Sequence, residues 1–132
     1  QARFCLLSEP RPDRAISMLN DQLVRGGIGD RFVTLAALIL DPAEHTFTLV
    51  NAGHQTPLRF CPKAKAFSLS VAEDVGGLPL GLMEGFEYQM ISARVDPGET
   101  IAVFTDGVTD AANPDGALFD MDGVYAVSDD PE

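Results

Sequence analysis

The chain has 132 residues, of which 45% are apolar and 22% are charged, and its net charge is −11. This composition is typical of a globular domain, and the negative charge argues against nucleic acid and anionic membrane as partners. The longest apolar run, residues 35–40 preceded by Phe32 and Val33, is far shorter than the ~18 residues of a membrane helix, so we expect no membrane insertion. Cys5 and Cys61 are too few for a disulfide framework, and we therefore expect reduced thiols in a cytoplasmic protein.

The first part of the chain predicts two helices. Residues 1–8 are interpreted as the last turns of a helix, which Pro10 and Pro12 then interrupt. Pro12 suits the first turn of a second helix that would end at Gly26–Gly27. Its apolar stripe consists of Ile16, Leu19 and Leu23.

Two β-hairpins are predicted next. Residues 31–40 form a nearly unbroken apolar strand of the kind that is covered on both faces, and residues 45–50 form its half-buried partner. Residues 56–60 and 66–71 predict the second hairpin. Three glycines and one proline then interrupt residues 76–82, which predict a shaped loop.

Residues 86–95 predict a further strand with an irregularity in it. Its apolar positions change parity halfway, in the order Phe86, Tyr88, Met90, then Ile91, Ala93, Val95. Because side chains alternate between the faces of a strand, this change predicts a β-bulge between Met90 and Ile91. Asp96–Pro97–Gly98–Glu99 has the signature of a type II turn. A weak helix is predicted over residues 117–127.

The stretch of residues 100–110 is the place where we expect chemistry. An apolar, β-prone run stops at Asp106–Gly107, and Asp110 follows four positions after Asp106. A strand that ends in a carboxylate holds a hard oxygen ligand in place, and a helix after Gly107 would bring both acids to one face. Residues 95–132 contain 10 acids and no base, which suits a divalent cation, although two solvated acids at a strand end are an equally good interpretation.

Several motifs, taken together, resemble those of one family. In chain order they are Phe32–Val33–Thr34–Leu35, Asn51–Ala52–Gly53–His54–Gln55–Thr56–Pro57–Leu58, Gly77–Leu78–Pro79–Leu80–Gly81, and Pro97–Gly98–Glu99 leading to Phe104–Thr105–Asp106–Gly107–Val108–Thr109–Asp110–Ala111. Their order and spacing resemble the PPM-type, metal-dependent serine/threonine phosphatases of the bacterial SpoIIE-like branch. The resemblance covers about residues 3–119.

The resemblance implies an α+β fold in which an antiparallel β-sandwich is flanked by helices. It also implies a Mn²⁺ or Mg²⁺ site at which a metal-bridging water attacks phosphoserine or phosphothreonine. Asp106 matches the metal-ligand Asp of the family, Asp110 stands where many relatives have an acid, and Gly53, His54 and Gly107 would lie near the site. For His54 a hydrogen-bonded structural role is the better interpretation, and no catalytic residue is assigned. The implied partner is a phosphorylated regulatory protein of the anti-sigma-antagonist type, in sigma-factor partner switching.

Two departures from the family pattern shape the remaining expectations. The first metal motif, Asp-x-x-Gly-His, is absent, and Asp129–Asp130 is not followed by the strand that the last motif requires. The chain also opens on Gln1 rather than Met. We therefore expect residues 1–132 to be one partial phosphatase domain, cut at both ends, which is inactive by itself and self-associates through uncovered edges.

Two alternatives to an enzyme fragment stay open. A non-catalytic pseudophosphatase would bind the regulatory partner through the same surface. A calcium-binding module is suggested by Asp120–Met121–Asp122–Gly123, but the remaining oxygen ligands of a loop site are missing.

Overall fold

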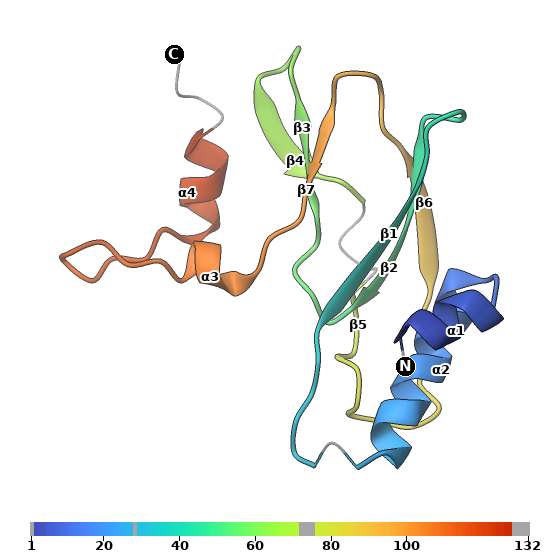
Figure 1. Ribbon diagram of the computed structural model, residues 1–132. Coiled ribbons are helices and arrows are strands. Elements are labelled where there is room, and N and C mark those ends of the chain that lie inside the picture. The colour runs from blue at the N-terminus through green and yellow to red at the C-terminus, as the bar shows by residue number, and fades with distance from the viewer. Residues whose placement is uncertain (1, 28, 72–75, 128–132) are drawn as a thin grey trace.

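Two β-sheets pack face to face in the computed structural model, which describes residues 2–27, 29–71 and 76–127 (Figure 1). Phe47 and Leu49 of the first sheet are buried between the sheets, and Ile101 of the second sheet packs against them. The predicted α+β sandwich is confirmed. Among the described residues the strand pairs are antiparallel except for the pairing of β2 with Gly76–Gly77, which is parallel.

Two helices precede the first sheet, as the sequence predicts. They are α1 (Ala2–Ser8) and α2 (Pro12–Arg25), and a proline begins α2 where its missing N–H costs nothing. Ile16 and Leu19 of α2 are buried against Val50 and Ala52 of β2. The stripe inferred from helical spacing is therefore the face that covers the sheet.

The first sheet is built around β2 (Thr46–Ala52). Strand β1 (Leu35–Asp41) pairs with it antiparallel, from Leu35 opposite Ala52 to Asp41 opposite Thr46. On its other side β2 pairs with β6 (Met90–Arg94) and β5 (Gly76–Gly77). The prediction for β1 was partly wrong, because the strand begins at Leu35 and Leu40 is 62% exposed. Strand β2, rather than β1, is covered on both faces.

The second sheet has the order β4–β3–β7. The predicted hairpin forms β3 (Leu58–Cys61) and β4 (Ala66–Leu69), and β7 (Thr100–Ala102) pairs with the free side of β3. After β7 the chain leaves the sheet and forms α3 (Asp106–Thr109) and α4 (Asp120–Ala126). The segment between these helices projects away from both sheets (Figure 1).

The prediction of a β-bulge between Met90 and Ile91 is wrong. Strand β6 pairs with β2 in unbroken register, from Thr46 opposite Arg94 to Val50 opposite Met90. Phe86 and Tyr88 precede the strand and pack in the cluster with α2, whereas Ile91 and Ala93 pack against the second sheet. The parity of the apolar residues changes because the chain changes the neighbour it packs against, and no extra residue is needed.

The turn prediction is confirmed, whereas the loop prediction for residues 76–82 is partly wrong because Gly76–Gly77 forms the short strand β5. At the type II turn the Glu99 N–H donates to the Asp96 carbonyl at 3.0 Å, and Gly98 has a φ of +90°. In the glycine-rich loop, Leu80 and Val33 exchange backbone hydrogen bonds of 2.8 and 3.0 Å. This exchange holds the loop beside the start of β1. No helix within the described ranges is long and apolar enough to cross a membrane.

Candidate functional site

Two strand ends converge on a cleft of about 220 Å³. The chain leaves β2 at Ala52 and turns through Gly53–His54, and it leaves β7 at Ala102 and reaches Asp106. The cleft is lined by Thr34, Gly53, His54, Gln55, Thr105 and Asp106. His54 and Asp106, which the resemblance implies to be near one site, both line this cleft.

The turn at Gly53–His54 is held by a buried asparagine. Asn51 is 2% exposed, its side-chain Oδ1 accepts from the His54 N–H at 2.9 Å, and its Nδ2 donates to the His54 carbonyl at 2.8 Å. Gly53 has a φ of +67°, a left-handed conformation in which a side chain is strained. The imidazole Nδ1 of His54 lies 3.2 Å from the Gln55 carbonyl oxygen. The turn therefore has a defined backbone shape.

The opposite wall of the cleft is formed by Thr105 and Asp106, where β7 gives way to α3. Thr105 is extended, and Asp106 opens the single helical turn of α3. The Asp106 carbonyl accepts from the Asp110 N–H at 2.7 Å and from the Thr109 hydroxyl at 3.0 Å. Asp106 and Asp110 are therefore one turn apart, and both are exposed, but Asp110 does not line the cleft.

The acids of this region provide only part of a metal site. Within residues 2–27, 29–71 and 76–127, no three His, Cys, Asp or Glu side chains come together as possible ligands. Mn²⁺ and Mg²⁺ each require about six ligands. The carboxylates of Asp106 and Asp110 suit these ions chemically, but they are too few for a two-ion centre. Asp129–Asp130 lies outside the described residues.

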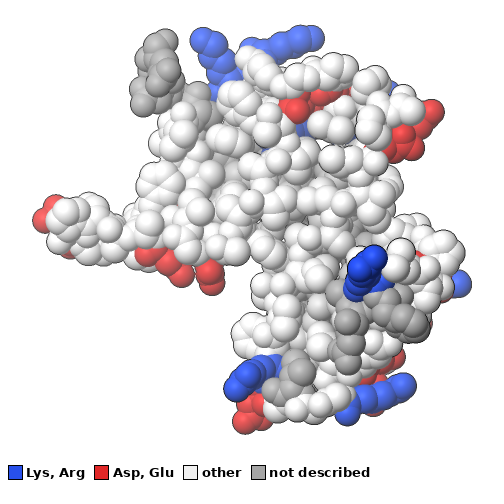
Figure 2. All heavy atoms as spheres, viewed as in Figure 1, with Lys and Arg blue, Asp and Glu red and all other residues white. Residues whose placement is uncertain are grey.

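Charge is distributed unevenly around the cleft. The projecting segment at the left of Figure 2 has acidic side chains and no basic ones, in agreement with residues 105–119, which include Asp106, Asp110 and Asp115 but no Lys or Arg. In this view Lys and Arg lie at the top of the molecule and over its lower half, where Figure 1 places α1 and α2. The side of the cleft formed by the projecting segment therefore favours cations.

Some lining residues were not singled out from the sequence as site residues. Thr34, Gln55 and Thr105 each lie next to, or inside, a motif that was recognised, yet none carries a charge that would mark it. Gln55 also reaches α4, because its Nε2 donates to the Met121 sulfur at 2.6 Å. The available signal was their position inside those motifs. Gly107 follows Asp106 in α3 and, like Asp110, lies outside the lining.

Comparison with known proteins gives related sequences and related folds. Phosphoserine phosphatase RsbU of Bacillus subtilis is 26% identical over 107 residues, which are 81% of this chain and 31% of RsbU. Protein IcfG of Synechocystis sp. is 28% identical over 106 residues, which are 80% of this chain and 16% of IcfG. The chain thus spans less than a third of the length of these relatives.

Solved structures show the same fold. The RsbU and RsbW domains of Rv1364c from Mycobacterium tuberculosis match with a TM-score of 0.69 and 22% identity, over 84% of this chain and 30% of that one. The PP2C phosphatase domain with a fragment of the regulatory domain of SpoIIE from Bacillus subtilis matches with a TM-score of 0.64 and 19% identity, over 83% and 31%. The family model described as Stage II sporulation protein E (SpoIIE) matches residues 2–131. The chain therefore belongs to the SpoIIE family, as its motifs indicate, and has the fold of a PP2C phosphatase domain.

Proposed function

We propose that this chain is part of a metal-dependent phosphoserine/phosphothreonine protein phosphatase of the bacterial cytoplasm. Its substrate would be a phosphorylated regulatory protein of the anti-sigma-antagonist type. The observation that carries the proposal is the cleft in which the Gly53–His54 turn faces Asp106. Membership of the SpoIIE family and similarity to a protein named phosphoserine phosphatase support it.

The residues of the cleft have distinct roles in this proposal. Asp106 provides a hard oxygen ligand for Mn²⁺ or Mg²⁺, and Asp110 adds negative charge one helical turn away. When bound, such ions lower the pKa of a water and offset negative charge on a transferring phosphoryl group. Thr34 and Thr105 line the same space, and a threonine hydroxyl is able to donate a hydrogen bond to a phosphoryl oxygen. The backbone turn at Gly53–His54 forms the opposite wall.

The ligand set also limits what the 132-residue chain does by itself. Because Asp106 and Asp110 cannot hold two ions, we expect weak Mn²⁺ binding and little or no hydrolysis of phosphoserine peptides. The same shortage of ligands favours one second candidate, a pseudophosphatase that binds the phosphorylated regulator without hydrolysing it.

Calorimetric Mn²⁺ titration of the chain and of Asp106→Asn tests the proposal. Asp115→Asn is the matched control, since Asp115 is an exposed acid on the projecting segment and lies outside the cleft. We expect weaker binding in Asp106→Asn and unchanged binding in Asp115→Asn. Equal effects of the two substitutions would show diffuse attraction by acids and would contradict the assignment of the site.

Phosphate release from a phosphoserine peptide in the presence of Mn²⁺ separates the two functions. Little release by the 132 residues, together with turnover in a longer protein that carries an Asp-x-x-Gly-His motif, would support the phosphatase. Phosphopeptide binding without turnover in such a protein would favour the pseudophosphatase. Rapid release by the 132 residues that Asp106→Asn abolishes would show that two carboxylates suffice, and our account of the ligand set would be wrong.

A further inference from the structure

The loop between β5 and β6 connects α2 to the candidate cleft. The segment of residues 77–81, which includes the last residue of β5 and the start of this loop, begins beside the end of β2, where Gly77 pairs with Ala52. It then passes Gly53 and ends next to Asn20 of α2. We name residues 77–81 the strut.

At its α2 end, the strut is held by a fully buried asparagine. Asn20 is 0% exposed. Its Oδ1 accepts from the Gly81 N–H at 2.9 Å, and its Nδ2 donates to the Met83 carbonyl at 2.8 Å. Leu80, which is 1% exposed, packs in the same apolar cluster as Ile16 and Leu19 of α2. Both polar and apolar contacts therefore attach this end of the strut to one helix.

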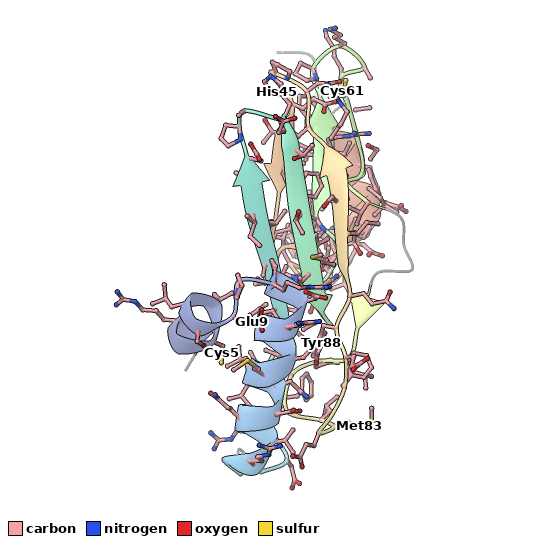
Figure 3. All side chains as sticks on the ribbon, turned by 90° about the vertical axis from the view of Figure 1, so that its right-hand side faces the viewer. Cys5, Glu9, His45, Cys61, Met83 and Tyr88 are labelled. Atoms are coloured by element: carbon pink, nitrogen blue, oxygen red, sulfur yellow. The ribbon has the colours of Figure 1, made fainter. Side chains whose placement is uncertain are left out.

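Tyr88 provides a second attachment. Its hydroxyl donates to the Leu78 carbonyl at 2.7 Å, and its backbone N–H donates to the Ser17 hydroxyl of α2 at 3.1 Å. Its ring also lies against Gly77, where an added Cβ would be 2.8 Å from Tyr88 Cδ1 and 2.8 Å from the Asn51 carbonyl oxygen. Figure 3 shows Tyr88 and Met83 alongside α2.

At the cleft end, the strut is closely packed against the Gly53–His54 turn. A Cβ added to Gly53 would lie 2.5 Å from Pro79 Cγ and 2.6 Å from Pro79 Cδ. The proline ring thus packs directly on the Gly53 backbone. The neighbouring Leu80 bonds to Val33, which precedes the cleft residue Thr34. A displacement of the strut would therefore move both the Gly53–His54 turn and the backbone next to Thr34.

We propose that the strut sets the position of the Gly53–His54 turn relative to Asp106, and that Asn20 is a positioning residue for the cleft. Asn20 acts through Gly81, Pro79 and Gly53 and is not among the residues that line the cleft. The geometric statement stands independently of catalysis, and only its consequence for a bound metal rests on the proposed function.

Amide hydrogen exchange of Asn20→Asp tests the geometric statement. The substitution keeps the acceptor for Gly81 but replaces the donor to Met83 with an oxygen. Loss of one buried hydrogen bond predicts that protection of the Leu80, Val33 and His54 amides falls roughly tenfold relative to Thr48 in the centre of β2. Arg25→Gln is the matched control, because it removes an exposed 2.6 Å ion pair between the same helix and Glu84. We expect no selective change in the control.

Tyr88→Phe provides the second variant, in case Asn20→Asp does not fold. It removes only the hydroxyl that donates to Leu78, and the same three amides should lose protection selectively. A merely structural role for Asn20 and Tyr88 would lower protection by the same factor throughout the domain. That uniform loss, or a loss that stops at Leu80 and spares His54, would overturn the proposal.

Paramagnetic broadening by added Mn²⁺ then connects the strut to the metal. Broadening depends steeply on distance, so a displaced turn predicts altered broadening of the Gly53 and His54 amides in Asn20→Asp but not in Arg25→Gln. If the unsubstituted protein shows no broadening near Asp106, the proposed metal function fails, and the exchange experiment still decides the geometric proposal. Selective exchange changes without any change in broadening would overturn the claim that the strut positions the turn relative to the metal.

Discussion

Replacement of Gly53 by alanine tests whether the turn beside the cleft is as tightly packed as its geometry indicates. The added methyl would meet Pro79 Cγ at 2.5 Å, a contact shorter than carbon atoms tolerate. The alanine backbone would also have to adopt the φ of +67° that Gly53 has. Gly27 offers a matched control, because its φ is +64° and a Cβ there would meet nothing within 4 Å.

The two substitutions separate a conformational cost from a packing cost. A left-handed alanine costs about 1 kcal/mol, part of which is offset because alanine restricts the unfolded chain. Overpacking of a close contact costs a further ~1–3 kcal/mol. We therefore expect Gly27→Ala to lower the free energy of unfolding by about 1 kcal/mol and Gly53→Ala to lower it by about 2–4 kcal/mol.

Urea denaturation followed by circular dichroism measures both values at equal protein concentration. The difference between the variants, about 1–3 kcal/mol, is the contribution of the Pro79 contact. A difference near zero would mean that Pro79 moves aside at little cost. The close packing of the strut on the turn would then not be a rigid contact, and our reasoning about the cleft wall would be refuted.

Three further predictions concern the core, the sheet edge and a buried phenol. Leu49→Ala, at a 0% exposed position, should cost about 2–5 kcal/mol in the free energy of unfolding, and denaturation measures the loss. Within the described residues β1 pairs only with β2, so the other edge of β1 should support self-association of the protein. Leu40 is exposed on β1, and sedimentation should show that Leu40→Lys weakens this self-association. Burial and the Asp21 carboxylate raise the pKa of Tyr88 above its ordinary value of 10.0, so its contribution to stability is present below that pH and is lost as the pH rises through the folded value. Phenolate absorbance of Tyr125→Phe, in which Tyr88 is the only tyrosine left, checks this shift.

The sequence by itself determined the features that depend on neighbouring residues. Pro12 begins α2, Gly26 follows its end, and Gly98 occupies the left-handed position of a type II turn. Spacing alone also identified Ile16 and Leu19 as the buried stripe of α2. These predictions succeeded because caps, turns and amphipathic periodicity are set by local backbone sterics and by the period of the element.

The motifs at 51–58 and 104–111 indicated the family, and they correctly suggested that two strand ends would meet. The tertiary structure decided which residues line the cleft. It brings Thr34 and Thr105 to the cleft and leaves Asp110 outside its lining. No periodicity in the sequence distinguishes these residues, because their positions depend on how the two sheets pack.

The tertiary structure also decided what the apolar pattern of residues 86–95 means. Read as a single strand, the change of parity requires a bulge, but Tyr88 packs in the cluster with α2 and Ile91 packs between the sheets. Similarly, the Gly81 N–H donates directly to the Asn20 side chain. The two residues are far apart in the sequence, so no local pattern indicates this hydrogen bond. A side chain's neighbours across the fold are contributed by distant segments, so a local pattern can indicate that a residue is buried but cannot identify the residues that bury it.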